Sequence, residues 1–228
     1  MTFQANISEF AEFMGTEIKR IEKKIPEGGG GGQSSGSAII TGVGRPDKPV
    51  TTDGKITGNE PNGTFYSSTN GAGVGAYLWQ KQNNKWNVIS ADTGVRRITD
   101  GAVNIKQGYV SLRRVNNTVE CAFTGGAWGA IYFYGSASQN FKRKTHPKRM
   151  DILGNSKIPF GFRSTTSIML PFYSDDGEHI GMVYVGGTAN YNYIELRFKD
   201  KPPTEDMDIT RMPVISWITD EPFPATLP

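Results

Sequence analysis

Tyrosine and tryptophan side chains gather at two places in this sequence where they could bind a ligand. Aromatic faces pack against the apolar C–H surface of a sugar ring, and nearby hydroxyl and amide groups can pair with the sugar hydroxyls. One place is the glycine-bounded run 125–135, and the other is the turn opened by Gly186-Gly187. The candidate ligand-binding residues are Trp128, Tyr132, Tyr134, Tyr191, Asn192 and Tyr193. Packing between protomers is the alternative interpretation of both runs.

Alternation within the first run predicts which aromatic side chains are accessible. A strand over residues 129–134 would turn Ile131 and Phe133 toward a core. The same alternation, extended backwards, would put Trp128, Ala130, Tyr132 and Tyr134 together on the opposite face.

A cluster of basic residues forms a second kind of candidate site. The candidate anion-binding residues are Lys142, Arg143, Lys144, Lys148 and Arg149. Clustered cations bind phosphate-bearing polymers without reading sequence, and the simpler interpretation of the same cluster is a solvated loop. The formal net charge of the whole chain is only +3, which gives no argument for nucleic-acid binding.

No residue pattern indicates catalysis, a metal site or a cofactor. The histidines His146 and His179 lie far apart and outside any metal-ligand spacing. Asp175, Asp176 and Glu178 fit a hairpin turn. With Glu195 they are the only convenient carboxylates for a polymer-degrading enzyme, which would need a pair in a cleft. We therefore expect a binding protein and not an enzyme, with no cofactor.

Cysteine use and hydropathy narrow the class of protein further. The single cysteine, Cys121, excludes an intrachain disulfide, and its alternation with Val119 and Phe123 predicts a buried small side chain. No apolar run is long enough to span a membrane, so we expect no membrane insertion.

Apolar side chains recur every three or four residues near the N-terminus, which predicts a coiled-coil helix. The predicted oligomerisation residues are Ile7, Phe10, Met14, Ile18, Ile21 and Ile25. Isoleucine at such positions favours three strands or more. A helix folded back onto its own β-domain is the alternative. The predicted segments are a helix over residues 1–27 and a Gly/Ser linker over residues 28–37.

The remaining chain is patterned as β-structure in two parts. Residues 38–95 are predicted to be a small β neck module, with strands over 63–69, 75–82 and 86–91. Residues 96–228 are predicted to be a β head domain, with strands over 109–114, 118–123, 129–134, 168–173, 181–185 and 193–198. Asn83-Asn84 and Asn116-Asn117 fit hairpin turns. The proline-studded tail is predicted to be extended and anchored by Trp217. The fold class is mainly β: a sandwich, jelly roll or barrel.

Several motifs resemble those of bacteriophage tail proteins. The runs Gly73-Val-Gly-Ala-Tyr-Leu-Trp and Lys85-Trp-Asn-Val are similar to a module in tail proteins of phages of Gram-positive hosts. The run Gly108-Tyr-Val-Ser-Leu-Arg-Arg-Val-Asn-Asn and the ending Ser216-Trp-Ile-Thr-Asp-Glu-Pro-Phe-Pro resemble the C-terminal head domains of minor tail or receptor-binding proteins. The resemblance implies a homotrimer with a jelly-roll-like head that recognises host surface glycans.

The expected function is therefore that of a virion tail protein that binds a host cell-surface glycan or an anionic, teichoic-acid-like wall polymer during adsorption. The expected partners are further copies of the chain, other tail or baseplate proteins and the host polymer. A structural capsid or tail decoration (a head fibre) without its own receptor is the alternative.

Overall fold

The computed structural model describes residues 39–142, 146–187 and 191–228. The described chain is mainly β, as the sequence predicts, and residues 37–228 form one compact unit. None of the helices among the described residues is long and apolar enough to cross a membrane. The predicted coiled-coil residues Ile7 to Ile25 lie outside the described residues.

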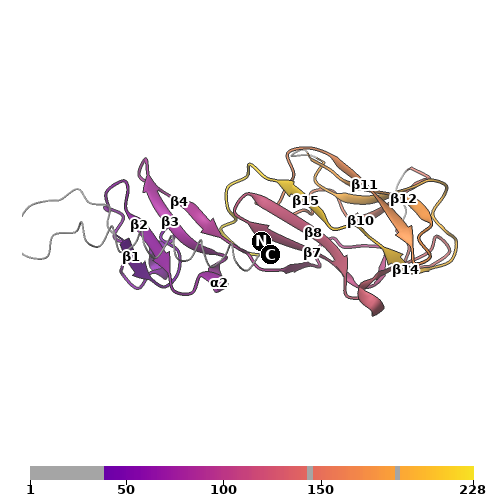
Figure 1. Ribbon diagram of the computed structural model, residues 1–228, viewed down its shortest axis with the longest axis horizontal. Coiled ribbons are helices and arrows are strands. Elements are labelled where there is room, and N and C mark those ends of the chain that lie inside the picture. Colours follow the sequence, from indigo (N-terminus) through magenta and orange to yellow (C-terminus); the bar gives the residue numbers. More distant parts are fainter. Residues whose placement is uncertain (1–38, 143–145, 188–190) are drawn as a thin grey trace, which may run out of the picture. The chain divides into compact units, whose positions relative to one another are not determined.

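The first sheet has four strands in the order β1-β2-β3-β4 (Figure 1). Its strands are β1 (Ile39–Gly42), β2 (Phe65–Ser68), β3 (Ala76–Gln82) and β4 (Lys85–Ala91). Two short helical turns, η1 (Pro49–Thr51) and α2 (Gly71–Val74), lie in the connections. Tyr66 and Trp79 are fully buried and pack edge to face with their ring centroids 5.8 Å apart, so this sheet has an aromatic core of its own.

Paired asparagines make the predicted hairpin turns. Asn83 and Asn84 have φ angles of 51° and 59° between β3 and β4, and Asn116 has a φ of 51° in the next hairpin. Asparagine tolerates this left-handed conformation better than most residues, and the turn needs it to match the twist of the strands.

The later strands form a four-stranded and a seven-stranded sheet. The four-stranded sheet has the order β15-β8-β7-β5, and the seven-stranded sheet has the order β10-β13-β12-β11-β14-β9-β6. The strands of the first of these are β5 (Arg96–Ile98), β7 (Tyr109–Val115), β8 (Thr118–Thr124) and β15 (Ile215–Ile218). Those of the second are β6 (Ile105–Gln107), β9 (Ile131–Phe133), β10 (Arg149–Leu153), β11 (Ile168–Ser174), β12 (His179–Val185), β13 (Ile194–Phe198) and β14 (Met207–Arg211).

One hydrophobic core lies between these two sheets and makes the region sandwich-like. Leu112 and Cys121 come from the smaller sheet, and Phe133, Phe172 and Leu196 come from the larger one; all are fully buried. Burial raises the pKa of the Cys121 thiol far above its usual range. The predictions of a sandwich-like β fold and of a buried Cys121 are therefore confirmed.

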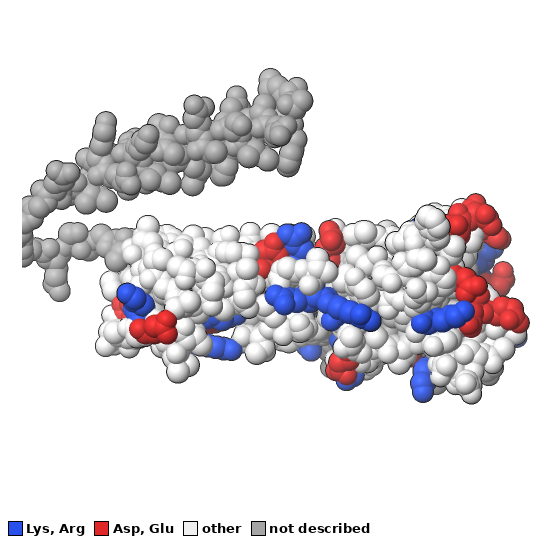
Figure 2. Space-filling model, turned by 90° about the horizontal axis from the view of Figure 1, so that it is seen from below, with Lys and Arg blue, Asp and Glu red and all other residues white. Residues whose placement is uncertain are grey.

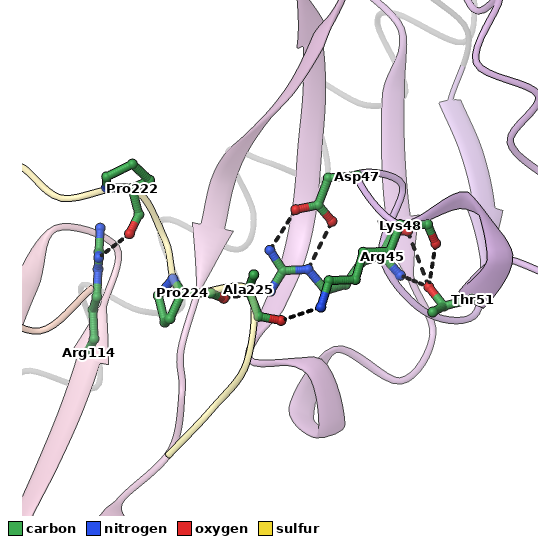
Figure 3. A network of polar contacts seen from close by, with 8 residues as sticks. All are labelled: Arg45, Asp47, Lys48, Thr51, Arg114, Pro222, Pro224 and Ala225. Atoms are coloured by element: carbon green, nitrogen blue, oxygen red, sulfur yellow. Dashed lines mark hydrogen bonds and ion pairs between the residues drawn. The ribbon is translucent and has the colours of Figure 1, made fainter. Parts of the chain in front are cut away.

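The chain after β15 returns to the first sheet (Figure 1). Phe223 packs against the core of the first sheet, and the Arg114 side chain of β7 donates hydrogen bonds to the carbonyls of Glu221 and Pro222. The buried Arg45 donates to the Pro224 carbonyl at 2.7 Å, and Lys48 donates to the Ala225 carbonyl at 2.8 Å (Figure 3). We call residues 219–228 the tail strap, because they join the first sheet to the sandwich.

The structure corrects two local predictions. Residues 127–129 form a 3₁₀ turn, η2 (Ala127–Gly129), and the strand begins only at Ile131. Ala130 is buried, so the alternation that placed it and Trp128 on the face of Tyr132 is wrong, although Ile131 and Phe133 do enter the core. Strand β10 begins at Arg149, so this last member of the basic cluster lies in a strand and not in a solvated loop.

Candidate functional site

One face of the seven-stranded sheet is turned away from the sandwich core. Val183 of β12 and Ile194 and Leu196 of β13 are fully buried in the core. Their neighbours along each strand alternate with them and therefore point to the opposite face of the sheet. The strand register places Tyr184 opposite Glu195 and Arg149 opposite Arg197 on that outer face. We call the outward group Arg149, Tyr184, Tyr193, Glu195 and Arg197 the platform.

The aromatic part of the platform is held by three contacts. The guanidinium carbon of Arg197 lies 3.7 Å from the centre of the Tyr184 ring, which is a close cation–π contact. The Tyr193 ring lies 5.5 Å from the Tyr184 ring at 39°. The Tyr184 hydroxyl and the Ser167 hydroxyl share a hydrogen bond of 2.8 Å. The two rings and the guanidinium are therefore fixed before any ligand arrives, which lowers the entropic cost of binding.

Glu195 holds the charged part of the platform together. Its carboxylate is fully buried and accepts a hydrogen bond of 2.7 Å from Arg197 Nε. Arg149 Nη1 lies 3.5 Å from the same oxygen. Asp151 lies opposite Glu195 on the neighbouring strand, so two arginines face two carboxylates and the formal charge of this area is zero. A balanced surface with aromatic rings suits a neutral polar ligand better than a polyanion.

Glycines shape the turn that leads into the platform. A Cβ atom on Gly186 would collide with the Tyr191 carbonyl oxygen, and one on Gly187 would collide with the backbone of Thr166. The Gly186 N–H donates to the Tyr193 carbonyl at 2.9 Å. These close approaches fix the path of the backbone at Gly186 and Gly187. Tyr191, which the Gly186 backbone approaches, is 60% exposed.

The structure divides the second aromatic run between surface and interior. Tyr191 is exposed, and the half-buried Tyr193 belongs to the platform. Asn192 is only 1% exposed, so its side chain does not reach the platform surface.

The first aromatic run lies on a different part of the same sheet. Trp128 is 83% exposed on η2, where its φ of 59° is unusual for a residue other than glycine. Tyr132 is half-buried on β9 against Gly126, a position where a Cβ atom would touch its ring. Tyr134 is half-buried beyond the end of β9. Since β9 is three strands from β12, these residues do not join the platform directly.

The basic candidates do not act as one group where they are described. Arg143 and Lys144 lie outside the described residues, and Lys142 is exposed. The Lys148 ammonium donates to the Lys199 carbonyl at 2.8 Å, and Arg149 pairs with Glu195 in the platform. The face in Figure 2 carries basic side chains along its middle and acidic side chains toward its right-hand end.

A pocket of about 410 Å³ lies beside the tail strap and is a weaker candidate. Its lining includes Arg45, Trp86 and Arg114. Both arginines already donate to backbone carbonyls and to neighbouring groups, so their donors hold the fold together.

Sequence reasoning missed three of the platform residues: Tyr184, Glu195 as a structural anion, and Arg197. All three stand at outward positions in strands that the sequence predicts, and this alternation is the signal that could have singled them out. Comparisons with protein-family models, with curated proteins and with solved structures return no match for this chain.

Proposed function

We propose that this chain is a virion tail protein of a bacteriophage with a Gram-positive host, and that its platform binds a neutral saccharide of the host cell surface. The observation that carries the binding proposal is the Tyr184–Arg197–Glu195 arrangement, with a second ring at Tyr193. The phage assignment rests on the resemblance of the sequence motifs.

The chemistry of the platform supports a saccharide as the ligand. Tyrosine rings offer flat apolar faces to sugar C–H groups. The Tyr184 hydroxyl and the guanidinium of Arg197 offer hydrogen bonds at the edge of those rings, and Arg197 retains 26% of its side-chain exposure. The zero formal charge of the area favours the neutral glycan over the anionic wall polymer.

The proposal includes assembly as a homotrimer through the N-terminal coiled-coil residues, with a jelly-roll-like head. Three copies would combine weak sites into a strong attachment through avidity. Light scattering on the full chain tests this part, and we expect the mass of three chains. A monomer would overturn the trimeric arrangement and leave the platform proposal to be judged by binding alone.

Adsorption blocking and glycan binding test the function itself. Purified protein is expected to bind members of a printed array of neutral glycans and to slow adsorption of the phage that encodes it. Tyr193→Ala is expected to abolish both effects. Tyr77→Ala is the matched control, because Tyr77 is a partly exposed tyrosine (40%) on β3, away from the platform. Glycan binding without any effect on adsorption would favour the structural decoration, and no binding to any glycan would overturn the proposal.

A further inference from the structure

A second cluster of aromatic and charged side chains lies farther along the outer face that carries the platform. Tyr173 pairs with Arg211 across β11 and β14, and with His179 across β11 and β12. Directly opposed residues in antiparallel strands point to the same face. Tyr173 is also four residues from Met169, which lies opposite Tyr184, so both ends of β11 present side chains to this face.

Arg211 ties this second cluster to the exposed indole. Its Nε donates to Asp175 Oδ1 at 2.7 Å, and its Nη1 donates to the Trp128 carbonyl at 3.0 Å. The rings of Tyr173 and His179 lie 5.7 Å apart. We call Trp128, Tyr173, Asp175, His179 and Arg211 the second cluster.

Trp128 is the member that points to a ligand. A tryptophan in the left-handed region costs about 1 kcal/mol, and a residue that is 83% exposed recovers little of it by burial within the described chain. Its backbone is nonetheless fixed by Arg211. A strained, anchored and exposed aromatic side chain is typical of a site where binding compensates the strain.

Two apolar side chains lie between the two clusters, and Arg197 of the platform lies opposite one of them, Met182. Pro171 and Met182 lie opposite each other between the Tyr184 end and the Tyr173 end, and both are half-buried. Tyr173 lies four residue steps beyond Met169 along β11, which is about 13 Å at 3.3 Å per residue. That span is longer than one sugar ring.

We infer that the ligand is an oligosaccharide of several neutral sugar units that lies along β11 and contacts both the platform and the second cluster. This inference rests on the proposed function and adds the length of the ligand to it. The platform would hold one end of the chain between Tyr184 and Tyr193. Trp128 and Tyr173 would stack on sugar rings farther along, which makes affinity depend on chain length.

The test compares binding to neutral oligosaccharides of one to eight units, printed as length series on an array. The full-length protein is expected to bind four-unit or longer members about tenfold more tightly than single sugars, the contribution of one good aromatic anchor. Trp128→Ala is expected to lose this gain while keeping the binding of the shortest members. Trp128→Ala should fold normally because the side chain is exposed, and Phe160→Ala, at another exposed aromatic residue, is the matched control.

The outcomes separate the two proposals. One outcome is binding that is abolished by Tyr193→Ala but depends neither on the length of the ligand nor on Trp128. It would overturn the role of the second cluster in binding and leave the proposed function standing. Absence of binding to every member of the array by the unmodified protein would overturn the proposed function and this inference with it.

Discussion

Replacing Arg114 by alanine tests whether the tail strap joins the first sheet to the sandwich. The Arg114 side chain is 5% exposed and donates to the carbonyls of Asn116, Gly161, Glu221 and Pro222. Its guanidinium carbon also lies 5.0 Å from the centre of the Phe223 ring. One side chain thus contacts the turn after β7, the loop before β11 and the strap.

The expected loss of stability follows from these contacts. A hydrogen bond from a charged donor contributes about 1.5–3 kcal/mol, and less where water can replace the donor. The bond to Gly161 is buried and the other three are partly buried, so we assign about 4 kcal/mol to the four together. Burial lowers the pKa of Arg114, which means that the folded protein already bears a desolvation cost for this cation. Removing the cation relieves part of that cost, and we expect Arg114→Ala to lower the free energy of unfolding by about 3 kcal/mol.

The neighbouring Arg113 supplies a matched control. Arg113 is 45% exposed and pairs with Asp92 at the surface, so Arg113→Ala should cost less than about 1 kcal/mol. Urea unfolding followed by tryptophan fluorescence measures both variants, because Trp79 lies in the first sheet and Trp217 in the sandwich. If the two variants lost equal stability, the strap contacts would not carry the energy assigned to them here.

Three further predictions concern single side chains. Burial opposes ionisation of Glu60, but hydrogen bonds from Thr57 and Lys81 outweigh it and hold the pKa of Glu60 at about 2 instead of 4.5. The stability that the ionised form of Glu60 provides is complete above about pH 4.5 and is lost as the pH falls toward 2. Between pH 6 and pH 2.5, the urea midpoint of Glu60→Gln should therefore fall less than that of the unmodified protein. An equal fall in both proteins would contradict this. Cys121 should react with a thiol reagent only in denaturant, because it is fully buried and its pKa is raised; modification of the folded protein at a rate near that of free cysteine would refute the burial. Phe223→Ala should lower the free energy of unfolding in urea by about 2 kcal/mol, because Phe223 packs against the core of the first sheet. Phe160→Ala, at an exposed site, should lower it by less than about 1 kcal/mol. Equal losses would place Phe223 outside that core.

The hairpins could be predicted because their signals are local. Alternating apolar residues define β7 and β8, and the Asn116-Asn117 turn between them supplies the left-handed conformation that the hairpin needs. The same reasoning finds β3 with β4. Trp217 is buried and donates its indole N–H to the Phe162 carbonyl, as the prediction of an anchored tail requires.

The short strands and the buried ions could not be predicted from sequence. Strands β5 and β6 have three residues each, too few to show a period, and each forms by pairing with a strand already in a sheet, β5 with β7 and β6 with β9. Arg114 stands at an inward position among apolar residues, and four carbonyls, three of them distant in sequence, explain why a cation is stable there. Glu195 is likewise paired with arginines from its own strand and from β10, which a strand pattern does not reveal.

The tail strap also sets an order of events during synthesis. The first sheet is complete in sequence at Ala91, but Phe223 contributes to its core and is made about 130 residues later. At about 5–20 residues per second, Phe223 is synthesised on the order of ten seconds after Ala91. During that interval the core of the first sheet, which includes Tyr66 and Trp79, lacks one of the side chains that pack against it in the folded protein, so the growing chain depends on finishing translation to protect a segment that left the ribosome early.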